Sequence, residues 1–194
     1  MQALNEVRQD PQHKVLLFQD EATFYRQPSQ GWLWWWLGRK QPKMRYSNKS
    51  NTRMRVVGFM HAVTGMVLSW DMSTVTARRL ARCIREVSAA FPEAERIYLA
   101  WDNWPVHSHP LVLEALQKDL RICVLPLPTY APWLNPIEKL WRLVRQEVEH
   151  AHPWSDQFDV FKTVIRDKLS EFAHGSPRLL HYCGLKIPMG TINC

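Results

Sequence analysis

"HKVLLFQDEATF", residues 13–24, is an apolar run that closes on two adjacent carboxylates, Asp20 and Glu21. Its aliphatic and aromatic residues predict a buried strand from about Lys14 to Phe24, and Asp20 is expected where that strand ends. A second stretch has the same design, since "ERIYLAWDN" (residues 95–103) predicts a strand that ends at Asp102. The sequence therefore predicts two buried strands, each with an aspartate at its end.

The remaining periodicity predicts an α/β chain. Residues 54–72 suggest two strands joined at the Thr64–Gly65 turn, and residues 121–128 a fifth strand. Amphipathic helices are expected over residues 76–91, 109–120, 137–148 and 155–172. We therefore expect a mixed five-stranded sheet flanked by helices, in which the first and fourth strands are parallel neighbours. No period is apparent beyond Gly175.

Composition and charge indicate which class of protein this is. The chain has 194 residues, of which 46% are hydrophobic, which suits one globular domain. No run approaches the roughly 20 apolar residues of a membrane span, and the polar start lacks a secretory signal, so a cytoplasmic protein is expected. The net charge of +7 favours a polyanionic partner, most often nucleic acid.

The two aspartates indicate a cation site. If their strands are parallel neighbours, both carboxylates emerge at the same edge of the sheet, where open α/β sheets bind ligands. Like charges at short range raise each other's pKa or require a cation between them. A hard divalent ion such as Mg²⁺ takes oxygen ligands and retains several waters, so few carboxylates suffice.

Glu138 has two possible roles from sequence alone. Asn135, Pro136 and Glu138 open a helix with the spacing of a capping box, and Glu138 could also pair with Arg142 one turn later. The alternative is that Glu138, which borders the inward apolar stripe, reaches over the sheet edge toward the aspartates. That stripe is expected to contain Ile137, Leu140, Trp141, Val144 and Val148.

Three motifs together resemble a known family. "QDEATF" (residues 19–24), "AWDNWPVH" (100–107) and "YAPWLNPIEKLW" (130–141) are similar to the acidic motifs of DDE transposases. The likeness is to the bacterial insertion-sequence 630 branch of the mariner-like superfamily, and it extends from about Val15 to Val148. The third motif is the most specific, although Ala131 stands where the family often has Ser.

The resemblance implies an RNase H-like fold and metal-dependent chemistry on DNA. Asp20, Asp102 and Glu138 would form the catalytic triad and hold two Mg²⁺ ions, for which Mn²⁺ would substitute. The reaction would be strand cleavage at transposon ends, followed by strand transfer into target DNA. A bacterial, nucleoid-associated enzyme is implied. Asn103 and His107 match positions beside the second aspartate, where His107 would contact DNA or orient a water.

The connection between the first two strands, residues 25–53, is rich in tryptophan and basic residues. The family carries an insertion at this place that helps pair subunits and grip DNA, so a homodimer is expected. The basic residues predicted to contact phosphate, here and on the helix after Glu138, are Arg39, Lys40, Lys43, Arg45, Arg142 and Arg145. The alternative for the tryptophans is a local hydrophobic cluster over the sheet edge.

We expect residues 1–194 to be a single catalytic domain with no N-terminal helix-turn-helix module, so that a separate helix-turn-helix protein would recognise the transposon ends. Two other functions remain open. One is a different RNase H-like nuclease, such as a hybrid nuclease or a junction resolvase. The other is a non-catalytic DNA-binding or assembly protein. Glu21 is assigned a structural role by strand alternation, and Asp71 is expected to begin a turn.

Overall fold

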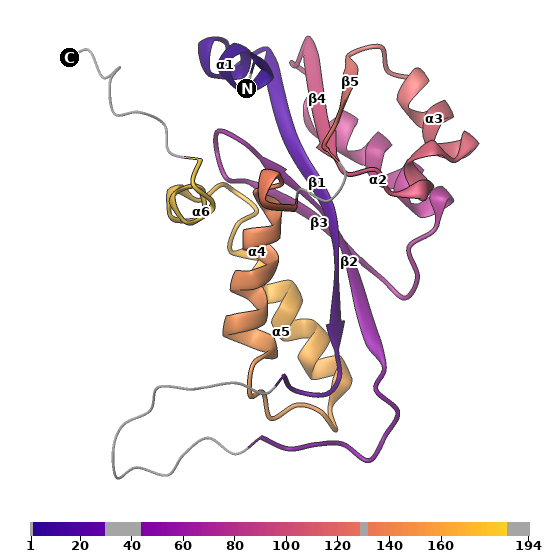
Figure 1. Cartoon of the computed structure of the whole chain (residues 1–194), viewed down its shortest axis with the longest axis vertical. Helices are drawn as coiled ribbons and strands as arrows, with labels where there is room; N and C mark the ends of the chain where they lie inside the picture. Colours follow the sequence, from indigo (N-terminus) through magenta and orange to yellow (C-terminus); the bar gives the residue numbers. More distant parts are fainter. Residues whose placement is uncertain (1, 30–43, 129–131, 186–194) are drawn as a thin grey trace, which may run out of the picture.

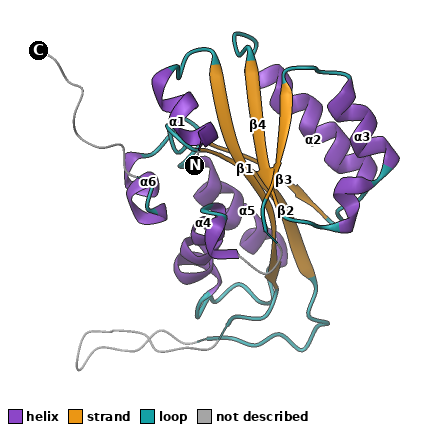
Figure 2. Ribbon diagram, turned by 45° about the horizontal axis from the view of Figure 1, so that its top comes forward, coloured by secondary structure: helices purple, strands orange, loops and turns teal. Residues whose placement is uncertain are grey.

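The computed structural model describes residues 2–29, 44–128 and 132–185 (Figure 1). It contains one five-stranded sheet with the strand order β3-β2-β1-β4-β5. Helices cover both faces of this sheet (Figure 2). The predicted α/β class with a mixed sheet is therefore confirmed, and among the described residues no helix is both long and apolar enough to cross a bilayer.

The sheet joins an antiparallel half to a parallel half. Its strands are β1 (Lys14–Tyr25), β2 (Arg53–His61), β3 (Val67–Met72), β4 (Arg96–Trp101) and β5 (Ile122–Pro126). β1, β2 and β3 pair antiparallel, whereas β4 runs parallel to both β1 and β5. The predicted neighbour relation between the first and fourth strands is thus correct.

One face of the sheet packs against α2 (Ala77–Ala90) and α3 (Pro110–Gln117). Thr76 caps α2 by accepting a hydrogen bond from the Arg79 amide, and the helix buries a stripe that contains Leu80, Cys83, Ile84 and Val87. Alternate residues of β1, such as Val15 and Leu17, face this layer. Strand alternation thereby separates the two hydrophobic layers.

The opposite face packs against α4 (Ile137–Val144) and α5 (Phe158–Ser170). Every residue predicted to face inward on the helix expected over residues 137–148 is buried, and Leu16 and Phe18 of β1 meet this layer. The chain continues from α4 into η3 (Arg145–Glu149), a π-helix. Two elements that the sequence did not predict, α1 (Gln2–Gln9) and α6 (Pro177–Cys183), complete this layer through buried residues such as Val7 and Leu179.

The base of the long connection between β1 and β2 is tied to the segment between α4 and α5. The Gln27 side chain accepts from the Ser47 amide at 3.0 Å and donates to the Ser47 carbonyl at 2.8 Å, which joins the two stems. The Ser29 amide donates to the Glu149 carbonyl at 3.2 Å, and Ser155 Oγ donates to the Arg45 carbonyl. Both stems are therefore held, while the tryptophans at 32 and 34–36 lie outside the described residues.

Two expectations about acidic residues were wrong. Asp71 does not begin a turn: it lies inside β3 and accepts a 2.7 Å hydrogen bond from Arg166 of α5. Asp20 does not end its strand, because β1 continues to Tyr25 on the strength of its pairing with β2. An apolar run ends at Asp20, but the antiparallel hydrogen bonds of β2 carry the strand five residues further.

Candidate active site

Asp20 and Asp102 leave the parallel part of the sheet at matching positions. The ladder between β1 and β4 ends at the Phe18–Ala100 pair. Asp20 and Asp102 each lie two residues beyond this pair, one on a strand that continues and one where the strand has just ended. Both aspartates therefore lie at one edge of the sheet, where the parallel pairing of β1 with β4 ends.

Asp20 is held by a residue of α4. The Trp141 indole nitrogen donates a hydrogen bond to Asp20 Oδ2 at 3.0 Å. Trp141 approaches this closely because Gly58 of β2, the partner of Asp20 in the antiparallel ladder, has no side chain. A Cβ at position 58 would lie 2.5 Å from Cη2 of Trp141. The first and third motifs thus meet over a glycine.

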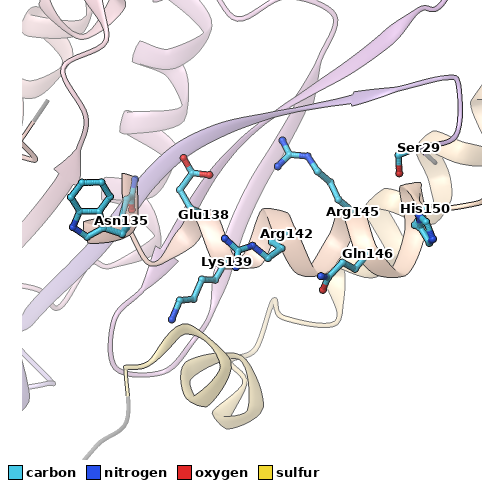
Figure 3. Close-up of a pocket in the computed structure, with 9 residues that line it drawn as sticks. Ser29, Asn135, Glu138, Lys139, Arg142, Arg145, Gln146 and His150 are labelled. Atoms are coloured by element: carbon cyan, nitrogen blue, oxygen red, sulfur yellow. The ribbon is translucent and has the colours of Figure 1, made fainter. Parts of the chain in front are cut away.

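Glu138 lies in the first turn of α4, but the predicted capping box does not form. The Asn135 side chain donates to the Gln19 carbonyl at 3.0 Å, and its Oδ1 has no hydrogen-bond partner among the described residues. Nor does an ion pair join Glu138 to Arg142 within the part of the chain that the structure describes. Asn135 instead ties the start of α4 to β1, and Glu138 faces the sheet (Figure 3).

The carboxylates influence one another electrostatically. Burial raises the pKa of Asp20 to about 8, and the negative charges of Glu138 and Glu21 contribute to this rise. Burial also raises the pKa of Glu21 to about 7, with contributions from Asp102 and Glu138. Four acidic side chains thus share one region, and the positive charge of Arg55 opposes the rise at Glu21 without cancelling it. Such a cluster favours either protonation or a bound cation.

Asp102 is oriented by the turn that follows β4. Its Oδ1 accepts from the Trp104 amide at 3.2 Å, and its side chain is 57% exposed. His107, in the short helix η1 (Pro105–Ser108), places Nδ1 2.9 Å from the Asp102 carbonyl oxygen. The His107 ring stacks on Trp101 with centroids 4.2 Å apart, and burial lowers its pKa. A buried, neutral His107 that donates from Nδ1 supports the turn of Asp102 and presents little surface to DNA.

A pocket of about 680 Å³ runs along α4 from Glu138 to the base of the long connection (Figure 3). Cationic side chains of Lys139, Arg142 and Arg145 line it. Arg142 is exposed, and Arg145 lies with Nε 3.8 Å from Glu149 Oε2. Two of the predicted phosphate-contacting residues, Arg142 and Arg145, therefore share one groove with the candidate catalytic glutamate.

The other predicted DNA contacts are more scattered. Asn103 is exposed in the turn beside Asp102, and Arg45 is exposed at the base of the long connection. Arg39, Lys40 and Lys43 lie outside the described residues. The structure therefore brings only part of the predicted DNA-contacting set to the carboxylates.

The donor set suits a hard divalent ion. Carboxylate oxygens are the ligands that Mg²⁺ and Mn²⁺ prefer, and Mg²⁺ needs only one or two of them because it keeps several waters. Among the described residues, no three His, Cys, Asp or Glu side chains lie close enough together to hold one metal ion in this structure. Several buried polar atoms in or beside the three motifs have no hydrogen-bond partner within the described part of the chain: both side-chain polar atoms of Gln19, Glu21 Oε2, His107 Nε2 and Asn135 Oδ1.

Some positioning residues were not recognised from sequence. Trp141 was expected only as part of the apolar stripe, and Gly58 and Gln19 were not singled out. Their roles depend on contacts between distant segments, since 121 residues separate Trp141 from Asp20. The available signal was the tryptophan at a fixed spacing after Glu138 in "NPIEKLW".

The sequence of this chain is similar to those of known proteins. A family model described as DDE superfamily endonuclease matches residues 15–160. The insertion element IS630 uncharacterized 39 kDa protein of Shigella sonnei is 24% identical over 166 residues, which are 84% of this chain and 48% of that protein. The chain thus spans about half the length of this relative.

Solved structures share the fold. The Mos1 mariner paired-end complex with Mn has a TM-score of 0.63 and 17% identity, over 94% of this chain and 54% of that chain. The catalytic domain of Mos1 mariner transposase has a TM-score of 0.56 and 17% identity, over 94% of this chain and 80% of that chain. These likenesses confirm the expected RNase H-like fold.

The similarity to the family, which three short motifs first indicated, therefore covers all five strands of the sheet and α4. The matched region contains both aspartates at the sheet edge and Glu138 on the helix beside them. On this match, the chain belongs to the DDE superfamily of endonucleases.

Proposed function

We propose that this chain is the catalytic domain of a DNA transposase, which cleaves DNA at transposon ends and transfers the cut strand into target DNA. The observation that carries the proposal is the matched placement of Asp20 and Asp102, two residues beyond the last pair of the β1–β4 ladder. Glu138 on α4 adds a third carboxylate, close enough to raise the pKa of Asp20. In support of it, three acids from three distant segments lie near one sheet edge, where they have no evident packing role.

Asp20, Asp102 and Glu138 would hold two Mg²⁺ ions, with Mn²⁺ as a substitute. Such ions supply Lewis-acid stabilisation of the attacking and leaving oxygens of a phosphodiester exchange. The protein's own contribution is orientation. Trp141 fixes one oxygen of Asp20, while the Trp104 amide and His107 fix the turn of Asp102. No serine, tyrosine or cysteine nucleophile is required, because the attacking group is a water in cleavage and a DNA 3′-hydroxyl in strand transfer.

DNA contacts would come from several elements. Arg142 and Arg145 line the groove beside Glu138, and Arg45 and Asn103 are exposed in two other connections of the fold. Residues 25–53 would act as an insertion of a single catalytic domain, with basic residues at 39, 40 and 43 on phosphate. We further propose a homodimer that acts on the nucleoid, with end recognition by a separate helix-turn-helix protein.

A metal-binding measurement tests the site without requiring full transposition. Mn²⁺ anomalous scattering from crystals of the native chain should show density between Asp20 and Asp102 within reach of Glu138, and Asp102→Ala should abolish it. Glu93→Gln is the matched control, because Glu93 is exposed at the opposite end of β4. Absence of a peak at saturating Mn²⁺ would overturn the proposal.

Nuclease assays separate this function from its rivals. With Mg²⁺, the native chain should nick duplex DNA that carries the element's ends, and Asp20→Asn should be inactive. Faster cleavage of an RNA–DNA hybrid than of duplex DNA would indicate a hybrid nuclease instead. Full function in Asp102→Ala would indicate a non-catalytic DNA-binding protein.

A further inference from the structure

Trp133 is an exposed indole beside the candidate active site. It lies in the short helix η2 (Pro132–Leu134), just before the start of α4, and 76% of its surface is accessible. By contrast, Trp101 and Trp141 are only 4% and 0% exposed. An aromatic ring of this size costs solvation free energy when left in water, so its exposure next to a reactive edge suggests a ligand.

Trp133 shares a groove with cationic residues. It lines the same 680 Å³ pocket as Glu138, Arg142 and Arg145, with His150 at the far end. The helical path from Glu138 to His150 spans on the order of 18 Å at about 1.5 Å per residue. That length equals about five nucleotide steps at roughly 3.4 Å each along one strand. The groove can therefore follow a short stretch of one strand.

The cationic side chains of the groove differ in whether they already contact other groups of the protein. Lys139 Nζ donates to the Cys183 carbonyl at 3.2 Å, and the Arg145 guanidinium lies over the Phe24 ring and near Glu149. Arg142 is exposed, and no hydrogen bond or ion pair engages its side chain among the described residues. Arg142 is thus available for a phosphate at the middle of the groove.

We propose, on the basis of the transposase function above, that this groove binds one DNA strand and that Trp133 stacks on an unpaired base next to the phosphate to be cut. A basic groove that ends in an exposed aromatic ring is the usual arrangement for single-stranded DNA, because every base offers a flat apolar face. Bases in an intact duplex hide these faces.

Binding to matched DNA substrates tests the proposal. The native chain, Trp133→Ala and Trp133→Phe are titrated, in EDTA so that cleavage does not interfere, with a blunt duplex, the same duplex with a three-nucleotide overhang, and the single strand. Trp133→Ala should lose about 5- to 150-fold affinity for the substrates with unpaired bases, the range that base stacking gives. Its affinity for the blunt duplex should change less than twofold, and Trp133→Phe should retain most of the preference.

Leu134→Ala is the matched control. Leu134 is the adjacent residue, is 47% exposed, and does not line the pocket. Its substitution should leave all three affinities within twofold. A 2-aminopurine in the overhang should also be quenched by the native chain and not by Trp133→Ala, which reports stacking directly.

Several outcomes would overturn the inference. These are an equal loss by Trp133→Ala on paired and unpaired substrates, no loss at all, or tighter binding of single-stranded RNA than of the same DNA sequence. The proposed function fails separately, by metal-dependent cleavage that persists in Asp20→Asn. A chain that cleaves through Asp20 but does not discriminate unpaired bases would disprove only the role of Trp133.

Discussion

The indole nitrogen of Trp141 lies 3.0 Å from Oδ2 of Asp20, which joins the helix of the third motif to the strand of the first. Trp141 is fully buried and packs edge-on against Phe24, with ring centroids 6.4 Å apart. A hydrogen bond donated to a carboxylate favours its ionised form, so Trp141 opposes the burial that raises the pKa of Asp20. One residue thus connects core packing to the candidate metal site.

Trp141→Phe keeps an aromatic ring but removes the donor. We expect Mn²⁺ affinity to fall by about 10- to 150-fold, since hydrogen bonds to charged groups contribute about 1.5–3 kcal/mol. Titration calorimetry or electron paramagnetic resonance of Mn²⁺ measures this directly. Phe161→Leu, a change of another fully buried aromatic residue in the same layer, should cost stability without altering Mn²⁺ affinity. Equal Mn²⁺ affinity in Trp141→Phe and the native chain would refute the role.

Gly58→Ala should displace Trp141, because the new Cβ would lie 2.5 Å from Cη2 and 2.8 Å from Cζ2 of the indole. Overpacking of this kind costs about 1–3 kcal/mol of unfolding free energy. A phenyl ring lacks both of those indole atoms. In a double-mutant cycle by urea denaturation, Gly58→Ala should therefore cost about half as much unfolding free energy in the Trp141→Phe background. Additive costs would show that the two positions do not interact.

Stability should depend on pH through Asp20 when no divalent metal is present. The folded state holds the pKa of Asp20 at about 8, above its ordinary value of 3.8. Between these values the folded chain retains a proton that the unfolded chain has released, so the free energy of unfolding falls as pH rises. Relative to Asp20→Asn, the native chain should lose up to about 1.4 kcal/mol per pH unit within this window.

Denaturant titrations in EDTA at pH 5, 6, 7 and 8 measure this dependence. Mg²⁺ should flatten it, because a cation in the cluster replaces the proton as the stabilising partner of the carboxylates. If the native chain and Asp20→Asn gave parallel pH profiles in EDTA, the burial of Asp20 would not govern its ionisation.

Arg142→Ala should weaken binding to all DNA substrates alike. Loss of one phosphate contact reduces the slope of log affinity against log salt by about 0.9. Fluorescence anisotropy over a salt series provides the slope. Arg78→Ala is the control, since Arg78 is exposed on α2, on the other face of the sheet. Identical slopes for Arg142→Ala and the native chain would place DNA elsewhere.

Local pattern was sufficient for the central elements of the fold. Continuous apolar runs identified β1 and β4, and the 3.6-residue period identified α2 and the inward face of α4. α1 and α6 were missed because each is short and offers few buried residues, so tertiary contacts rather than periodicity decide their helical state. The position of Asp20 inside β1 likewise depends on pairing with β2, which no local pattern contains.

The acidic residues of the candidate site could be predicted from the sequence, but the contacts that position them could not. Carboxylates at strand ends are visible in sequence, but the hydrogen bond from Asn135 to Gln19 replaced the capping box that spacing alone suggested. The buried Asn135 amide has two donor hydrogens and one acceptor oxygen. Its donor bonds to Gln19, which lies 116 residues away in the sequence, and spacing along the chain does not reveal such a partner. His107 was expected at the site, yet its stacking on Trp101 and its burial follow from the turn geometry.

The π-helix at Arg145–Glu149 limits how the length of the chain can vary. A π-turn accommodates one residue more than an α-turn, and here both Val148 and Glu149 face inward as a result. Glu149 Oε1 accepts the Tyr25 amide at 2.9 Å, where β1 leaves the sheet. Deleting Gln146 would restore an ordinary α-turn, rotate this carboxylate outward and remove the acceptor of the Tyr25 amide. Alignments of related chains should therefore tolerate gaps in the long connection far more readily than a one-residue gap here.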